Sequence, residues 1–256
     1  MPAMSQATPS TTLQIAMAHH RAGRLAEAES IYRAILARDP RCAEALDLLG
    51  VIAMQVGHGN PAVDFMRQAV ALSPDCARFH SNLGEAYRCQ GQLDAAIASL
   101  GQALVLQPEF PAALNSLGAA LVAQNRSAEA MTCLLRALQL DPRCTNAHLR
   151  LGNILMERGE LERAGDCFRR ELVLSPNSAD THNSLGAVLG MQGKTDEAVE
   201  SIRRAIALKP DFPEAHNNLG GILIDQGRLD DAIACYQQAI ALKPDYASAH
   251  SCLILA

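Results

Sequence analysis

The sequence predicts an all-α protein in which pairs of antiparallel helices repeat along the chain and stack into a solenoid. Two observations lead to this prediction: proline, glycine and alanine recur at one fixed interval, and apolar residues between them follow helical spacing. The composition agrees, because 49% of the residues are apolar, only 4% are aromatic, and Trp is absent. Such a chain suits helices packed through small side chains better than a β-sandwich.

The interval is 34 residues in each of three series. The prolines stand at 40, 74, 108, 142, 176, 210 and 244; the glycines are Gly50, Gly84, Gly118, Gly152, Gly186 and Gly220; the alanines are Ala28, Ala62, Ala96, Ala130, Ala164, Ala198 and Ala232. With the proline as position 32, seven repeats are predicted: 9–42, 43–76, 77–110, 111–144, 145–178, 179–212 and 213–246. We expect residues 1–8 to be a disordered tail, and 247–256 to be the start of an eighth first helix or a truncated cap.

Each repeat is expected to hold two amphipathic helices joined by a tight turn. The turn is marked by Gly23, Gly57, Gly91, Gly159, Gly193 and Gly227, with Asn125 in the same place in the fourth repeat. Gly and Asn readily take the left-handed conformation that ends a helix. Asp94, Asp196, Asp230 and Asn60 share one position after the turn, where they are expected to cap the second helix. The recurring proline then ends that helix.

The small residues predict close packing within a repeat. Glycine at position 8 and alanine at position 20 remove bulk where the two helices cross, so their axes can approach closely. One hairpin cannot bury both of its faces, so neighbouring hairpins must stack on one another.

The spacing of Leu83, Gly84, Tyr87, Ala96, Ala103 and Pro108 resembles the tetratricopeptide repeat (TPR) signature, and the resemblance covers residues 9–246. It implies a right-handed superhelical TPR solenoid whose first helices line an inner, concave wall. The first repeat departs most, with Ala16 in place of the glycine at position 8. The resemblance specifies a fold, whereas the family is a scaffold for many functions.

The charge and hydropathy of the chain argue against several classes of partner. A formal net charge of −5 and a pI near 5.9 give no field that attracts nucleic acid. No stretch is long and apolar enough to span a membrane, and no secretion signal is recognised, so a cytoplasmic protein is expected.

Neither the eight cysteines nor the eight histidines form a recognisable chemical motif. No C-x-x-C pair occurs, and six of the cysteines share two repeat positions, which suits reduced packing residues rather than disulfides or metal ligands. Five histidines share position 4, as a repeated helix-face residue would: His80, His148, His182, His216 and His250. We therefore predict no metal site, no cofactor, no catalytic residue and no enzymatic activity.

The TPR resemblance assigns the inner wall mainly to positions 2, 5, 6, 9, 12 and 13 of each repeat. Those positions hold a set of amides, which can bind the backbone of an extended peptide through a donor and an acceptor: Asn82, Asn115, Asn146, Asn153, Asn183, Asn217 and Asn218. The last two repeats add Asp180, Glu214 and Asp225, an acidic end that favours basic segments. The alternative is that these amides and carboxylates are solvated residues on an exposed helix face.

The leading hypothesis is a scaffold for protein–protein interaction that binds a peptide or partner segment in the concave groove. Asn82 and Asn218 at position 6, with the stretches around them, are similar in part to the repeat arm of O-linked N-acetylglucosamine transferases, whose inner asparagines hold protein substrates. This resemblance implies the alternative, a substrate-recognition arm of such a transferase whose catalytic domain is absent from this chain. Leu48, Ser116, Arg150 and Ser184 interrupt that row. The apolar Leu253, Ile254 and Leu255 suggest that a partner or self-association covers the C-terminal end, or that the natural chain continues into something absent here, such as a catalytic domain.

Overall fold

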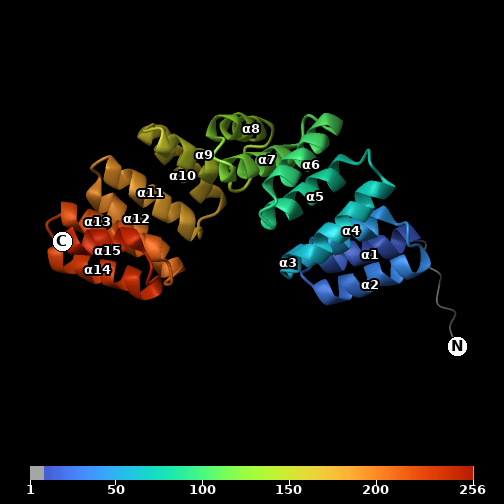
Figure 1. Ribbon diagram of the computed structural model, residues 1–256, viewed down its shortest axis with the longest axis horizontal. Coiled ribbons are helices and arrows are strands. Elements are labelled where there is room, and N and C mark those ends of the chain that lie inside the picture. Colours follow the sequence, from blue (N-terminus) through green and yellow to red (C-terminus); the bar gives the residue numbers. More distant parts are fainter. Residues whose placement is uncertain (1–8, 256) are drawn as a thin grey trace. The chain divides into compact units, whose positions relative to one another are not determined.

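The computed structural model describes residues 9–255, and the tail predicted for residues 1–8 lies outside them. These residues form helices and contain no strand, as the all-α prediction requires (Figure 1). The chain divides into two compact units, which we call the N-terminal unit (Met1–Leu140) and the C-terminal unit (Asp141–Ala256).

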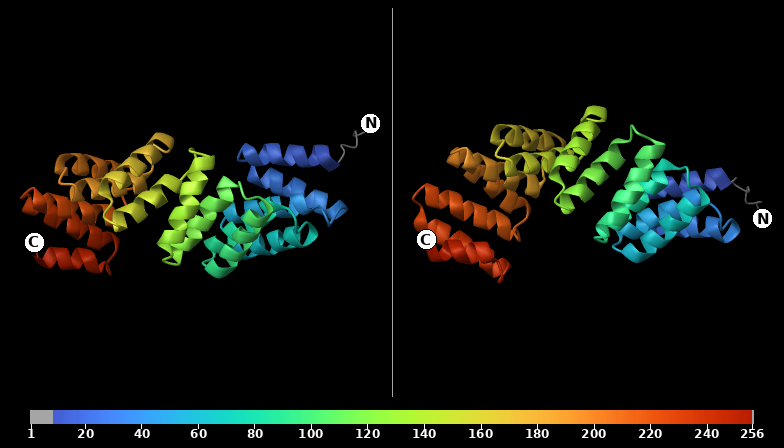
Figure 2. Two further views of the ribbon diagram at one scale, coloured as in Figure 1. Left: turned by 90° about the horizontal axis from the view of Figure 1, so that it is seen from above. Right: turned by 45° about the horizontal axis from the view of Figure 1, so that its top comes forward.

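Both units consist of consecutive helices joined by short loops (Figures 1 and 2). The N-terminal unit contains α1 (Pro9–Arg21), α2 (Leu25–Arg38), α3 (Ala43–Gln55), α4 (Gly59–Leu72), α5 (Ala77–Cys89), α6 (Leu93–Leu106), α7 (Pro111–Ala123) and α8 (Ser127–Leu140). The C-terminal unit contains α9 (Ala147–Glu157), α10 (Leu161–Leu174), α11 (Ala179–Met191), α12 (Thr195–Leu208), α13 (Pro213–Asp225), α14 (Leu229–Leu242) and α15 (Ala247–Leu255). Odd-numbered helices are the first helices of the hairpins, and even-numbered helices are the second.

The glycine at position 8 lets the two helices of a hairpin approach closely, as predicted. A Cβ atom added at Gly84 would lie 2.6 Å from Leu100 Cγ of the partner helix, and one added at Gly220 would lie 2.6 Å from Tyr236 Cε1. The alanines at position 20 complete this contact, because all seven are fully buried. The side chain at position 24 of the second helix therefore fills the space that the glycine leaves open.

The turn between the helices also follows the prediction. Gly91 has a φ of +72°, and Asn125, which takes the glycine position in the fourth repeat, has a φ of +60°. The N–H of Gln92, the residue after Gly91, donates to the carbonyl of Tyr87 at 2.9 Å. This bond closes the first helix in the Schellman pattern and directs the chain into the second helix.

The capping prediction for the second helix is wrong. The N-cap residues of α6 and α12 are Gln92 and Lys194, and neither side chain makes a capping bond. Asp94 and Asp196 are instead the second residues of these helices, where a carboxylate interacts favourably with the positive end of the helix dipole. The helix begins earlier than predicted because the chain enters it directly from the left-handed residue.

Helix α9 begins later than the other first helices. Asn146 precedes it in the left-handed conformation, with a φ of +61°, and its N–H donates to Glu171 Oε1 at 2.8 Å. Glu171 is fully buried on α10, at the repeat position where Ala137 and Ala205 stand. Its other oxygen, Oε2, is buried and accepts no hydrogen bond from the described residues. A carboxylate in place of alanine thus changes the start of the next helix.

Candidate functional site

Within each unit the first helices form the more closely spaced wall. Successive first helices contact one another, as α3 does with α5 and α5 with α7 in the N-terminal unit, and as α11 does with α13 in the C-terminal unit. No two second helices make a comparable contact in the described part of the chain. A stack whose members lie closer on one side curves toward that side, so the first helices line the inner wall of each unit.

The structure places six of the seven predicted asparagines on this wall, and all six are half-buried. They are Asn82 on α5, Asn115 on α7, Asn153 on α9, Asn183 on α11, and Asn217 and Asn218 on α13. Asn146 differs, because it is exposed and precedes α9. The expectation that Asn146 lies within a first helix is wrong, and the buried Glu171 that receives its N–H gives the physical reason.

In the N-terminal unit the amide of Asn82 is hydrogen-bonded to a buried carboxylate. Asp47 on α3 is fully buried, and Asn82 Nδ2 donates to both of its oxygens, at 2.9 and 3.0 Å. Arg78 forms an ion pair with the same carboxylate while its own side chain stays 44% exposed. Burial raises the pKa of Asp47, the bond from Asn82 and the charge of Arg78 lower it, and the charge of Glu44 raises it further; burial prevails. The carboxylate of Asp47 thus finds its hydrogen-bond and ion-pair partners within the protein.

The C-terminal unit has a hydrogen bond between the same repeat positions, but the charges of the residues differ. Asn218 Nδ2 donates to Asn183 Oδ1 at 3.0 Å, across the same separation of 35 residues that joins Asn82 to Asp47. Asn183 therefore stands where Asp47 stands, and Glu214 occupies the repeat position of Arg78. The cation of the N-terminal unit is replaced by an acid, and no side chain in residues 9–255 forms an ion pair with Glu214.

The predicted acidic residues lie at both ends of the inner helices. Asp180 and Glu214 stand in the first turns of α11 and α13, where the helix dipole favours negative charge. Asp225 is the last residue of α13, where the dipole disfavours it. None of the three is in an ion pair within the described residues. The C-terminal wall thus keeps negative charge that the chain does not neutralise.

An open pocket of about 370 Å³ lies on this part of the wall. It is lined by Ala187, Gly190, Met191, Asn217, Asn218, Gly221, Ile222, Asp225, Tyr236 and Cys252. Asn217 Oδ1 is buried and has no hydrogen-bond partner among the described residues. Burial raises the pKa of Tyr236 to about 12, and Cys252 adds to the shift, so this hydroxyl stays protonated at neutral pH.

The sequence did not predict the pocket itself, although a signal for it was present. Positions 9 and 12 of the inner wall carry Glu85 and Arg88 in the third repeat, but Ala187 and Gly190 in the sixth and Gly221 at position 9 of the seventh. Loss of side-chain bulk from these positions makes a hollow in the wall. Tyr236 and Cys252 could not be identified in this way, because they reach the pocket from α14 and α15.

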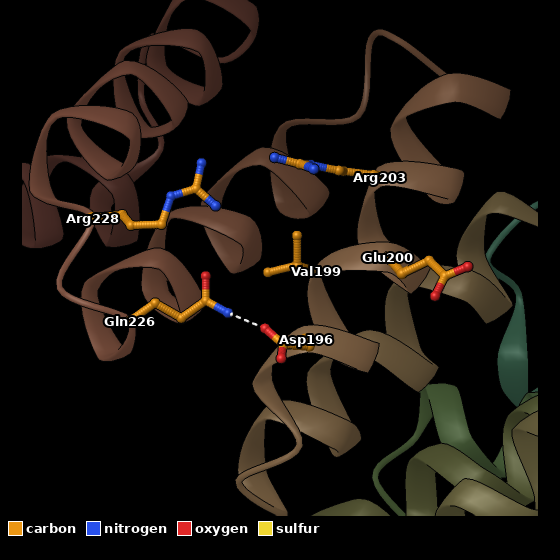
Figure 3. A pocket seen from close by; sticks show the side chains of 6 residues that line it. All are labelled: Asp196, Val199, Glu200, Arg203, Gln226 and Arg228. Carbon is orange, nitrogen blue, oxygen red and sulfur yellow. Dashed lines mark hydrogen bonds between the residues drawn. The ribbon is translucent and has the colours of Figure 1, made fainter.

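The second helices bear a different kind of cleft (Figure 3). Gln226, from the turn after α13, donates through Nε2 to Asp196 Oδ1 at 2.9 Å, and Arg203 and Arg228 lie on the other side of Val199. Gln124 makes the same bond to Asp94, at 2.6 Å, in the N-terminal unit. These bonds tie the turns after α7 and α13 to the preceding second helices, α6 and α12, and Arg228 is already paired with Asp231. We interpret this cleft as a structural junction.

The five position-4 histidines also have a structural role. The Nε2 atom of each lies within hydrogen-bond distance of the carbonyl oxygen of the proline six residues earlier; the distance is 2.8 Å between His80 and Pro74 and 3.3 Å between His148 and Pro142. These prolines stand two residues beyond the end of a second helix, where a carbonyl has no helical partner, and the imidazole N–H supplies one. No three His, Cys, Asp or Glu side chains in residues 9–255 are grouped as metal ligands would be.

No helix of the described chain is both long and apolar enough to cross a bilayer. The cysteines are free thiols, and burial raises the pKa of the Cys133, Cys167 and Cys235 thiols. A raised pKa keeps a thiol protonated and unreactive.

Comparisons with known proteins agree with this architecture. The family model described as "Cilia and flagella-associated protein 70 C-terminal domain" matches residues 1–217, and a model described as "TPR repeat" matches residues 220–253. No curated protein matches the chain. TPR proteins are in general scaffolds for protein interaction and typically have no catalytic activity of their own.

Solved structures share the fold at low sequence identity. The APC/C hetero-tetramer Cut9–Hcn1 matches with a TM-score of 0.84 and 16% identity, over 96% of this chain and 48% of that one, so this chain spans about half of its length. PilF of Pseudomonas aeruginosa matches with a TM-score of 0.74 and 20% identity, over 86% of this chain and 100% of that one. YrrB matches with a TM-score of 0.59 and 21% identity, over 73% of this chain and 96% of that one.

Both the helical hairpins and the sequence match therefore lead to one assignment. The chain is a TPR protein and belongs to the family described as the cilia and flagella-associated protein 70 C-terminal domain.

Proposed function

We propose that this protein binds an extended segment of a partner protein along its inner walls, and that the C-terminal unit selects segments with basic residues. The observation that supports this most directly is the open pocket on α13. It is lined by Asn217, whose buried amide oxygen has no partner among the described residues, and by Asp225, which forms no ion pair with them. Buried polar groups without partners cost free energy, which a ligand that supplies the missing donor recovers. YrrB, which shares the fold, is described as a TPR protein with an unusual peptide-binding site.

The two walls differ in what they offer such a segment. In the N-terminal unit, Asn82 is occupied by Asp47, which leaves little of its donor capacity for a ligand. In the C-terminal unit, Asn217 and the acidic Asp180, Glu214 and Asp225 remain for a partner. We therefore place the main binding surface on α11 and α13. The use of Asn82 within the chain also weakens the alternative of a transferase arm, for which that amide would have to face a substrate.

A peptide array probed with the full chain tests this proposal. The variant Asn115→Ala/Asn183→Ala/Asn217→Ala should lose peptides that the wild type captures, because main-chain donors and acceptors lose their partners. A matched control, Gln102→Ala/Gln139→Ala/Gln237→Ala, removes three exposed amides from second helices and should retain them. Equal peptide capture by wild type and by the asparagine variant, with both variants folded by circular dichroism, would refute groove binding.

Charge reversal tests the basic preference separately. The variant Asp180→Lys/Glu214→Lys/Asp225→Lys should lose basic peptides and gain acidic ones, because the sign of the local field changes. The wild-type affinity for basic peptides should also fall between low and high salt. An unchanged peptide preference in the charge-reversed variant would contradict the proposal.

A further inference from the structure

The pocket on the C-terminal wall is hollow for a reason that hairpin packing does not explain. A Cβ atom added at Gly221 would meet one atom within 4 Å, the Tyr236 hydroxyl oxygen at 3.9 Å. Glycine inside a helix is also disfavoured relative to alanine. The close approach of α13 and α14 requires glycine at Gly220, but it does not require it at Gly221. The missing side chain therefore creates room on the inner wall itself.

The polar groups of this hollow stand at two ends of one helix segment. Asn217 and Asp225 both line the pocket, and they stand eight residues apart, which corresponds to about 12 Å along a helix axis. Gly221 lies midway, with Gly190 of α11 beside the same space. A ligand that uses both groups must therefore carry a hydrogen-bond donor at one end, a long slender stem, and a cationic donor at the other end.

The N-terminal unit shows how an arginine side chain can bind to an inner wall that carries a carboxylate and an amide. There Arg78 reaches the carboxylate of Asp47 beside an asparagine amide, and its guanidinium stays partly in contact with solvent. In the C-terminal unit the residue at the position of Arg78 is Glu214, so the chain supplies no such cation. The groove of the C-terminal unit therefore lacks the arginine that the N-terminal unit provides for itself.

We propose that this pocket is a specificity site for one arginine side chain of the bound segment, which rests on the proposed function as a peptide-binding scaffold. Asn217 Oδ1 accepts the main-chain N–H of that residue, the aliphatic stem lies over Gly221 and Ile222, and the guanidinium pairs with Asp225. Arginine fits better than lysine, because its planar guanidinium offers several donors to a carboxylate, whereas an ammonium group acts as a point charge.

A positional-scanning library of short peptides, with each position fixed in turn to one amino acid, tests the assignment on the full chain. The wild type should select arginine at one position, with a Kd by fluorescence anisotropy about tenfold lower than that of the same peptide carrying lysine there. Citrulline, which keeps the shape of arginine without its charge, should bind as weakly as alanine at that position. Equal affinities for arginine and lysine, or for arginine and citrulline, would overturn the assignment.

Three variants locate the effect in this pocket. Asp225→Asn should weaken the arginine peptide about tenfold, because a charged hydrogen bond becomes a neutral one. Gly221→Leu should weaken it at least as much by filling the hollow, while leaving the folded state as stable as the wild type or more so, since leucine favours a helix more than glycine does. Glu200→Gln, which removes the same charge from the second helix α12, should leave the affinity unchanged.

The outcomes separate this inference from the proposed function. Peptide capture that depends on Asn183 and Asn217 but ignores Asp225 and Gly221 would leave the groove as the binding surface and refute the arginine pocket. Failure of every peptide to bind would refute both.

Discussion

The inner walls of the two units form hydrogen bonds between the same repeat positions, but they carry opposite charges at position 2. In the N-terminal unit, Asp47, Arg78 and Asn82 form a closed cluster in which both oxygens of the buried carboxylate have partners from the chain. At the corresponding positions in the C-terminal unit, Asn183 and Asn218 form one bond, and Glu214 is left without a cation. A repeat architecture thus allows one position to stabilise the fold in one repeat and to remain available for a partner in another.

The largest effect on stability is expected from a substitution that breaks the closed cluster. Arg78→Met should lower the free energy of unfolding by about 2–3 kcal/mol, less than for a fully buried pair because Arg78 is 44% exposed. Glu214→Met, the change at the equivalent position, should alter it by less than about 0.5 kcal/mol. Urea denaturation of both variants measures the difference. Equal losses would mean that the two walls do not differ as described.

A second pair of variants tests whether the scaffold beneath the two walls is the same. Gly84→Ala and Gly220→Ala each place a Cβ 2.6 Å from an atom of the partner helix, so both should cost about 2 kcal/mol by overpacking. Gly101→Ala is a control, because its Cβ meets no atom within 4 Å, and it should stabilise the protein slightly. A large loss in one unit and none in the other would show that the hairpins themselves differ.

The smallest expected effect is the pH dependence of the closed cluster. Because the pKa of Asp47 is raised in the folded state, the folded protein binds a proton there more readily than the unfolded chain does. Stability relative to Asp47→Asn should therefore increase as the pH falls through the raised pKa toward the ordinary value of 3.8, and stay constant below it. Urea midpoints measured across that range provide the test. A difference that decreases as the pH falls would mean that the pKa of Asp47 is lowered instead.

Much of the hairpin geometry was predictable from local sequence. The left-handed turn needed only the recognition that Asn125 replaces glycine, and the close helix crossing followed from glycine and alanine at fixed positions. The role of Asp94 and Asp196 was mistaken because their bonds go to Gln124 and Gln226, which lie 30 residues further along the chain. Local rules for helix capping contain no information about such partners.

The candidate site was only partly predictable, for the same reason. The amide and acidic residues of the wall could be read from repeat positions, but the burial of Asp47 and its bond to Asn82 depend on how two hairpins stack. The displacement of Asn146 depends on Glu171, a single substitution at a position of small residues in the next helix. The division into repeats says which positions are equivalent, whereas charge and burial at each position decide what they do.

Glu171 also bears on how the protein opens. Helix α9 begins at Ala147, later in its repeat than the other first helices, and the N–H of the preceding Asn146 donates to a carboxylate whose second oxygen has no partner in the described chain. Residues outside a helix exchange their amide protons through local fluctuations more readily than residues within one, which exchange through larger unfolding. Deuterium should therefore enter the backbone at residues 145–148 sooner than at the start of α11 or α13, so the connection before α9 is expected to open locally while those two helices stay folded.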